Sequence, residues 1–206
     1  HIPKTKFLAG NADFALGIVT GNNKKYISSV KNKDNEVILK GSDICKYHTN
    51  PNSNYIVFNP QNFQQVAPIE MYRAPEKLLY RFISSQLVFA YDDKQTLSLN
   101  SCNIVIPKIE GMQIKYILAI LNSSVSQFVY QKEFHSIKVL RAHMEHIPIP
   151  RVGKAIQNEI IAMTEPLICG MGKEAAETCQ KRLDCRIMDL FRLSAEEQWI
   201  IRHALH

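Results

Sequence analysis

No part of the sequence offers the roughly 18 consecutive apolar residues that a membrane-spanning helix requires, and no signal peptide is recognisable. Cysteine is sparse. The five cysteines are odd in number, irregularly spaced and without a Cys-x-x-Cys pair: Cys45, Cys102, Cys169, Cys179 and Cys185. We therefore expect no disulfide framework and a reducing, cytoplasmic location. Because the sequence starts at His1 rather than at a methionine, we expect it to be a piece of a longer polypeptide.

Recognisable catalytic motifs are also missing. No Gly-Lys-Ser/Thr run is present, which excludes a phosphate-binding P-loop. A metal-dependent nuclease centre needs a Glu and a Lys two residues apart, with a further carboxylate. Glu36 and Lys40 are four apart. The sequence thus predicts a chain without chemistry of its own, and an enzyme with an unrecognised site is the alternative.

Two pairs of residues have a spacing that a zinc site could use. They are Cys45-x-x-His48 and His143-x-x-His146. A structural zinc site needs four ligands, and neither pair is followed by a second pair at finger spacing. We therefore expect no metal site and expect His135, His143 and His146 to have structural roles.

Charge is distributed unevenly along the 206 residues. Residues 1–150 contain 17 Lys and Arg against 11 Asp and Glu, whereas residues 151–206 contain 8 of each. The whole net charge of +6 therefore belongs to the first part. A basic excess of this kind favours an anionic partner such as a nucleic-acid backbone, and a solvated basic face without a partner is the alternative.

The central part of the sequence predicts antiparallel strands at 78–83, 87–91 and 97–106. These runs are short, rich in β-branched and aromatic residues, and bounded by polar turn residues. Residues 92–96 are interpreted as a hairpin tip that carries Lys94. Further strands are expected at 16–21, 26–30, 36–40 and 55–58, and residues 1–15 are interpreted as a connector.

The turn between the strands at 16–21 and 26–30 reads Thr20-Gly-Asn-Asn-Lys-Lys25. Gly17 and Gly21 permit a positive φ or a close approach of the backbone. Backbone N–H groups, two amides and two ammonium groups then lie in one place, an arrangement suited to a phosphate and a base edge. A plain hairpin turn is the alternative.

Asparagine and glutamine are concentrated in two further loops, at 48–54 and 61–65. Their side chains can pair at two points with the major-groove edge of adenine. A loop that is simply solvated is the alternative.

Helices are predicted for most of the sequence from residue 114 onwards. Apolar residues over 114–129 follow a 3.6-residue period, and Asn122-Ser-Ser124 predicts a break between two joined helices. Ile147-Pro-Ile-Pro150 closes the first domain. Beyond it we expect one helix over 156–167 that ends at Pro166 and Gly170, a second over 175–190, and a third opened by Ser194 and Glu197 as a capping box. The predicted fold class is α+β: an antiparallel or mixed sheet with packed helices over 1–150, followed by a helical segment over 151–206.

Taken in order, these segments resemble the TaqI-like C-terminal specificity domain. The matching stretches are Gly17-Ile-Val-Thr-Gly-Asn-Asn-Lys24, Lys40-Gly-Ser-Asp-Ile44, Pro75-Glu-Lys-Leu-Leu-Tyr-Arg81, Ala90-Tyr-Asp92, Leu118-Ala-Ile-Leu-Asn-Ser123 and Ile147-Pro-Ile-Pro150. The tail 183–198 looks like the helix pair that often ends such enzymes. No single motif is specific, and the resemblance lies in the series and its order.

The resemblance implies a target recognition domain that reads a short sequence of double-stranded DNA for an adenine-specific methyltransferase or a type IIG restriction–modification enzyme. The Pro-Pro-aromatic loop that holds a flipped adenine is missing, so S-adenosylmethionine is expected only in a methyltransferase domain before His1. The expected DNA-binding residues are Thr20, Asn22, Asn23, Lys24, Lys25, Lys33, Arg73, Lys77, Arg81 and Lys94. The alternative is a protein–protein scaffold, or half of a specificity subunit, that forms a homodimer through 154–206.

Overall fold

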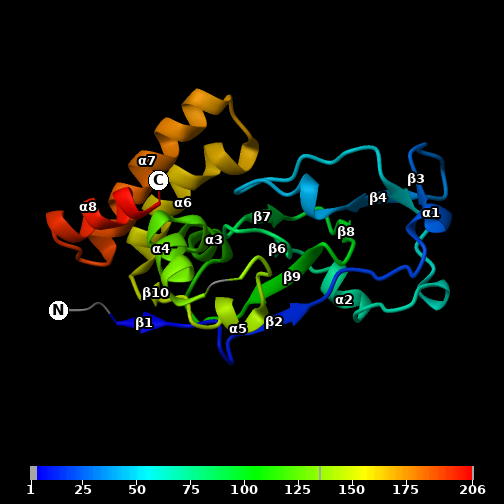
Figure 1. Ribbon diagram of the computed structural model, residues 1–206, viewed down its shortest axis with the longest axis horizontal. Helices are drawn as coiled ribbons and strands as arrows, with labels where there is room; N and C mark the ends of the chain where they lie inside the picture. The colour runs from blue at the N-terminus through cyan, green and yellow to red at the C-terminus, as the bar shows by residue number, and fades with distance from the viewer. Residues whose placement is uncertain (1–3, 135, 206) are drawn as a thin grey trace.

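A four-stranded antiparallel sheet lies at the centre of the molecule (Figure 1), which is seen here in a computed structural model that describes residues 4–134 and 136–205. Its order is β2-β9-β6-β7, with β2 at Ala12–Ala15, β9 at Cys102–Pro107, β6 at Lys77–Arg81 and β7 at Phe89–Asp92. The strands predicted around 78–83 and 87–91 are confirmed, as is the α+β fold class.

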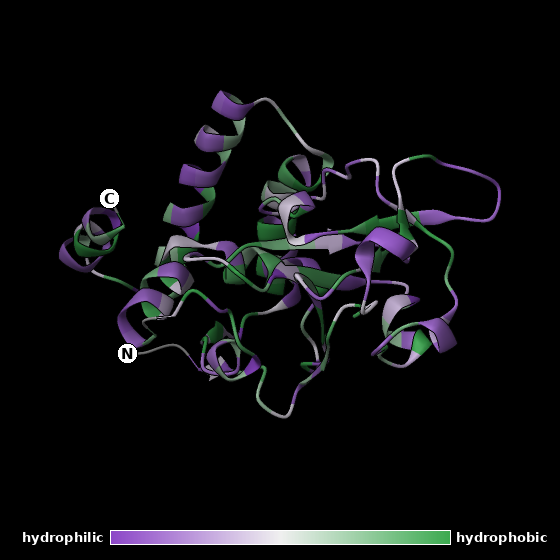
Figure 2. Cartoon of the chain, turned by 45° about the vertical axis from the view of Figure 1, so that its right-hand side comes forward, coloured by the Kyte–Doolittle hydropathy of each residue, from purple (hydrophilic) through white to green (hydrophobic). Residues whose placement is uncertain are grey.

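Both faces of this sheet are covered. Side chains alternate along β6, so Leu78 and Tyr80 join one buried cluster and Leu79 joins the other. Helices cover the first face, and a second small sheet with α2 (Ile69–Tyr72) packs against the other. Hydrophobic residues accordingly gather in the central strands, while hydrophilic residues line the outer helices (Figure 2).

The helical face begins with α3 (Ile114–Asn122) and α4 (Ser124–Glu133). The predicted break between them is confirmed at Ser123, whose hydroxyl accepts a hydrogen bond from the Ser126 N–H and so caps α4. Buried Asn122 ties the pair to the sheet, since its side chain accepts from Phe89 N at 3.0 Å and donates to Phe89 O at 2.9 Å.

The C-terminal helices are α6 (Lys154–Cys169), α7 (Lys173–Leu190) and α8 (Ala195–Ala204). The Ser194–Glu197 capping box is confirmed at the start of α8. Pro166 does not end α6, which continues to Cys169; Gly170, with a φ of +80°, terminates it. Ile160 of α6 and Leu183 of α7 belong to the same buried cluster as Leu78, so the segment predicted as 151–206 shares its core with 1–150.

The second sheet has the order β3-β5-β4-β8, with β3 at Ile27–Ser28, β5 at Tyr55–Ile56, β4 at Glu36–Leu39 and β8 at Leu97–Ser98. Two predictions fail here. The run 97–106 is split between β8 and β9, and 92–96 is not a hairpin tip, because β8 leaves the central sheet and pairs in parallel with β4. The short elements η1 (Gly41–Asp43) and η2 (Pro60–Asn62) flank β5.

The interpretation of residues 1–15 as a connector is also wrong for the part described. β1 (Thr5–Lys6) pairs with β10 (Ile149–Pro150), and β2 forms an edge of the central sheet. The short helix α5 (Arg141–Met144) precedes β10, whose proline lies in a two-strand ribbon where one N–H can be missing.

Candidate nucleic-acid interface

The loop at 20–25 forms a short helix rather than a hairpin tip. Asn22 caps α1 (Asn23–Tyr26) by accepting a hydrogen bond from the Lys25 N–H at 3.2 Å, and Gly21 before it has a φ of +76°. The cap replaces the predicted turn because an asparagine side chain satisfies a free N–H group in the first helical turn. Lys24 and Lys25 are consequently exposed on one turn of helix at the far end of the molecule from α7 and α8 (Figure 1).

Thr20 supports this loop from inside. Its side chain is only 4% exposed, and its hydroxyl donates to Asn23 Oδ1 at 2.6 Å and accepts from the Asn22 N–H at 3.1 Å. Thr20, predicted to contact DNA, is thus placed inside the loop, where its hydroxyl holds Asn22 and Asn23. Asn22 and Asn23 are exposed, and neither Nδ2 group donates a hydrogen bond within the described residues, so both remain available as donors.

Two glutamines that are far away in the sequence, Gln64 and Gln65, lie near the same loop. Val19 and Gln65 exchange two backbone hydrogen bonds, of 2.9 and 3.0 Å, and a methyl group added at Gly21 would lie 3.4 Å from Gln64 Cβ. Gln64 and Gln65, both exposed, are thus held against the segment that leads into Asn22 and Asn23. We call these four residues the amide patch; it brings donors and acceptors close to two lysines.

A second basic loop joins β3 to β4. Asn32 Oδ1 accepts from the N–H groups of Asp34 and Asn35 at 2.9 and 3.0 Å, and Asn35 Nδ2 donates to Val30 O at 2.9 Å. These bonds fix the loop while Lys33 stays exposed. The neighbouring Lys31 was not among the predicted site residues. Its ammonium lies 5.6 Å from the centre of the Tyr55 ring. Its position in the same loop as Lys33 could have identified it from the sequence.

Arg73 is engaged within the protein. Its guanidinium donates to both oxygens of Glu36, at 2.8 and 2.7 Å, and to Gln95 O at 2.9 Å, which leaves its side chain 32% exposed. The hydrogen bond to Glu36 raises the pKa of Arg73. Arg73 therefore joins the start of β4 to the loop that carries the exposed Lys94. Its positive charge is already neutralised by Glu36 and adds little to the basic character of this surface.

Lys77 is not a DNA-binding residue, contrary to the prediction. It is fully buried, and its ammonium binds the Asp92 carboxylate and Tyr72 O. Burial lowers the pKa of Lys77, and Asp92 opposes that shift. Arg81 is half-buried and donates from Nε to Ile44 O at 2.8 Å, so only part of its guanidinium can face a partner.

The residues with zinc-like spacing serve local structure. His48 Nδ1 lies 3.2 Å from Leu167 O, His143 stacks on Phe134 with ring centres 4.3 Å apart, and His146 Nδ1 lies 2.6 Å from Ala142 O. Across residues 4–134 and 136–205 no group of three His, Cys, Asp or Glu side chains could hold a metal ion. His135 lies outside the described residues.

The fold and this surface together define an α+β module with polar, basic loops at one end of a helix-backed sheet. Residues 36–149 match the family model of the TaqI-like C-terminal specificity domain, and the chain belongs to that family. A comparison with curated protein sequences finds no match. None of the helices in the described part of the chain has the length and hydropathy needed to cross a membrane.

Solved structures share the fold over nearly the whole chain. The type IIL restriction–modification enzyme MmeI in complex with DNA matches with a TM-score of 0.61 and 10% identity over 98% of this chain and 37% of that chain. A structure of a type I restriction–modification system gives 0.54 and 14%, covering 98% and 45%. The HsdS subunit from Thermoanaerobacter tengcongensis gives 0.50 and 14%, covering 98% and 44%. This chain therefore spans less than half the length of each of the three.

Proposed function

We propose that this chain reads a short sequence of double-stranded DNA as the target recognition module of a larger restriction–modification enzyme. The amide patch, flanked by the exposed Lys24 and Lys25, carries the proposal. Amide side chains recognise base edges by paired donors and acceptors, and the neighbouring ammonium groups bind the phosphates. The restriction–modification enzyme MmeI, whose structure in complex with DNA shares this fold, supports the assignment.

The larger enzyme, in this proposal, is an adenine-specific DNA methyltransferase, of type IIG if it also cleaves DNA. Its methyltransferase domain would bind S-adenosylmethionine and would be a direct partner of this chain. The work of this chain is to place the target base, and the methyl transfer belongs to that domain. Such an enzyme would act in the cytoplasm.

Removing the two lysines of α1 tests the phosphate contacts. If about five phosphates are neutralised, the logarithm of affinity falls against the logarithm of salt concentration with a slope of about −4 to −5. Lys24→Ala with Lys25→Ala should weaken binding to every duplex and make the slope shallower by about 2. Fluorescence anisotropy over a salt series measures both quantities.

The matched control is Lys154→Ala with Lys173→Ala, which removes the same charge from exposed lysines at the starts of α6 and α7. This control should leave the slope unchanged. Equal slopes for the α1 double variant and the parent protein would remove α1 from the interface.

Replacing one amide tests base reading. Gln64→Ala should lose discrimination at one base pair, by about 1–3 kcal/mol, without a change in the salt slope. Selection from a randomised duplex library, followed by binding to single-substitution duplexes, measures the preference. Asn158→Ala, an exposed amide on α6, is the control. An unaltered preference in the Gln64 variant would contradict its place in base recognition.

A scaffold that dimerises through 154–206 is the second candidate, favoured by one observation. Trp199 on α8 is 58% exposed and lies next to Ile200, which is 44% exposed. Sedimentation equilibrium discriminates the two functions, because a scaffold would show a concentration-dependent dimer that Trp199→Ser removes. Truncation after Pro150 is unsuitable, because α3 and α4 would lose the helices that cover them.

A further inference from the structure

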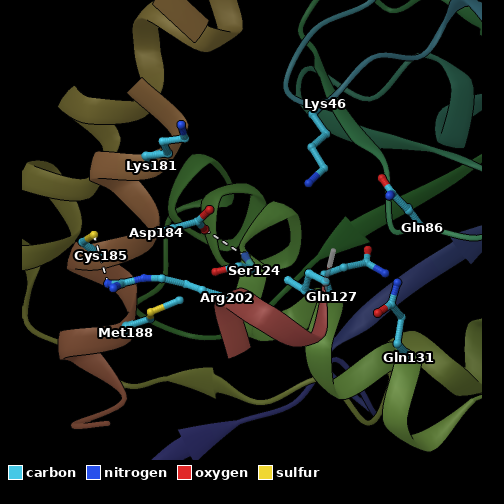
Figure 3. Close-up of a pocket in the computed structure, with 11 residues that line it drawn as sticks. Lys46, Gln86, Ser124, Gln127, Gln131, Lys181, Asp184, Cys185, Met188 and Arg202 are labelled. Atoms are coloured by element: carbon cyan, nitrogen blue, oxygen red, sulfur yellow. Dashed lines mark hydrogen bonds between the residues drawn. The ribbon is translucent and has the colours of Figure 1, made fainter. Parts of the chain in front are cut away.

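A cavity lies between α4 and the C-terminal helices α7 and α8 (Figure 3). α4, α7 and α8 form its walls, and two loops contribute Lys46 and Gln86. Its volume is about 480 Å³, well within the range of small-molecule sites and far larger than one water molecule requires. The helices that line it, α4, α7 and α8, lie at the opposite end of the molecule from α1 (Figure 1).

The cavity has a buried donor without a partner. Gln127 is only 5% exposed, and its Oε1 accepts a hydrogen bond from the Leu87 N–H at 2.8 Å, which fixes the orientation of the amide. Gln127 Nε2 is buried and has no hydrogen-bond partner within the described residues. Buried donors are normally satisfied, so an unpartnered one at a cavity indicates an acceptor supplied from outside.

Lys46 adds a cation that no carboxylate contacts directly. Its ammonium donates to Asn122 O at 3.2 Å and extends toward the cavity (Figure 3), and no ion pair joins it to Asp184 in the described part of the chain. Burial lowers the pKa of Lys46, and the more distant Asp184 charge opposes that shift. Since one hydrogen bond uses one of three N–H donors, Lys46 can bind a further acceptor.

Asp184 has a separate structural task. Its Oδ1 accepts a hydrogen bond from the Ser124 N–H at 2.8 Å and so stabilises the first turn of α4. Among the described residues, Asp184 is the one carboxylate that lines the cavity, against three cations, Lys46, Lys181 and Arg202. Met188 and Leu205 add an apolar wall.

We infer that this cavity is a binding site for a small organic anion with an apolar body. The oxyanion head accepts hydrogen bonds from Lys46 Nζ and Gln127 Nε2, and the body packs against Met188 and Leu205. The inference is independent of DNA recognition, because no residue of the amide patch or of α1 lines the cavity.

Benzoate and its neutral isostere benzamide test this inference on the 206-residue chain. The side-chain amide signals of Gln127 in ¹H–¹⁵N spectra report occupancy, and titration gives the dissociation constant. Benzoate should bind saturably and benzamide at least about tenfold more weakly, because the hydrogen bonds to the head are charge-assisted. Inorganic phosphate, which lacks the apolar body, should compete but bind more weakly than benzoate.

Lys46→Met keeps the length of the side chain and should weaken benzoate by at least about tenfold, whereas Lys46→Arg should retain binding. Lys94→Met, at the other end of the molecule, is the matched control and should bind like the parent protein. If Lys46→Met does not fold, Arg202→Gln replaces it, since Arg202 also lines the cavity, is exposed and donates hydrogen bonds only to Gln198 and Cys185 within the described residues. Equal binding of benzoate and benzamide, no binding of benzoate, unchanged affinity in the charge variant, or displacement of benzoate by duplex DNA would overturn the inference.

Discussion

Asp92→Ala should lower the free energy of unfolding by about 3–5 kcal/mol, the usual cost of leaving one member of a buried ion pair alone. Lys77 and Asp92 face each other in the register of β6 and β7, and the Lys77 side chain is completely buried. Asp92 also accepts hydrogen bonds from Thr96, at 3.0 Å from the backbone N and 2.6 Å from Oγ1. The substitution thus removes a counter-ion and two acceptors together. Urea-induced unfolding, followed by circular dichroism, measures the change.

Two further variants separate these effects. Lys77→Met combined with Asp92→Asn removes both charges and should recover part of the loss, because no buried charge is left uncompensated. Asp13→Ala breaks the exposed pair between Asp13 and Lys108 and should cost about 0–1 kcal/mol. A loss in Asp92→Ala no greater than in Asp13→Ala would contradict the importance assigned to the buried pair.

Gly17→Ala should destabilise the protein by about 3 kcal/mol or more, at the upper end of overpacking effects. A methyl group at this position would lie 2.2 Å from Leu99 O, in the turn between β8 and β9, and 2.6 Å from Cys102 O, at the start of β9; both are backbone atoms. A side chain could rotate away from such a contact, but this turn links the two sheets and cannot move without disturbing both. The glycine N–H also donates to Asn103 Oδ1 at 3.1 Å.

Gly153→Ala is the matched control. Nothing lies within 4 Å of a methyl group there, and its φ of −68° suits any residue. The control should change stability by about 0.5 kcal/mol or less. Thermal and urea unfolding of the two variants measure the difference, and similar values for both would show that the approach of Gly17 to the turn has little energetic weight.

Local patterns were sufficient to predict much of this fold. The alternation of β6, the break at Ser123 and the capping box at Ser194 each depend on residues within a few positions of one another. The parallel pairing of β8 with β4 brings together residues almost 60 positions apart, and no local signal records it. For the same reason the sequence did not indicate that 151–206 shares a core with the sheet.

In the candidate site, too, features set by neighbouring residues were predictable and features set by distant residues were not. Lys24 and Lys25 lie in a polar run, and their predicted exposure is observed. Lys77 looked equally available, but its partner Asp92 comes from the adjacent strand and becomes apparent only from the sheet register. Arg73 likewise meets Glu36 across 37 positions. The basic residues that form ion pairs within the protein, and are not free to meet a partner, are those whose acidic partners are distant in sequence.

The path of the chain between the two sheets limits how recognition could be re-engineered. A continuous cassette from α1 to α2 holds Lys24, Lys25, both lysines of the basic loop and, apart from Asn22, the amide patch. This cassette lacks one strand of its own sheet. That strand, β8, is supplied by the segment between β7 and β9. Transplanting the cassette alone would therefore leave β4 with an open edge, whereas a graft that also exchanges 93–101 would carry its own closing strand.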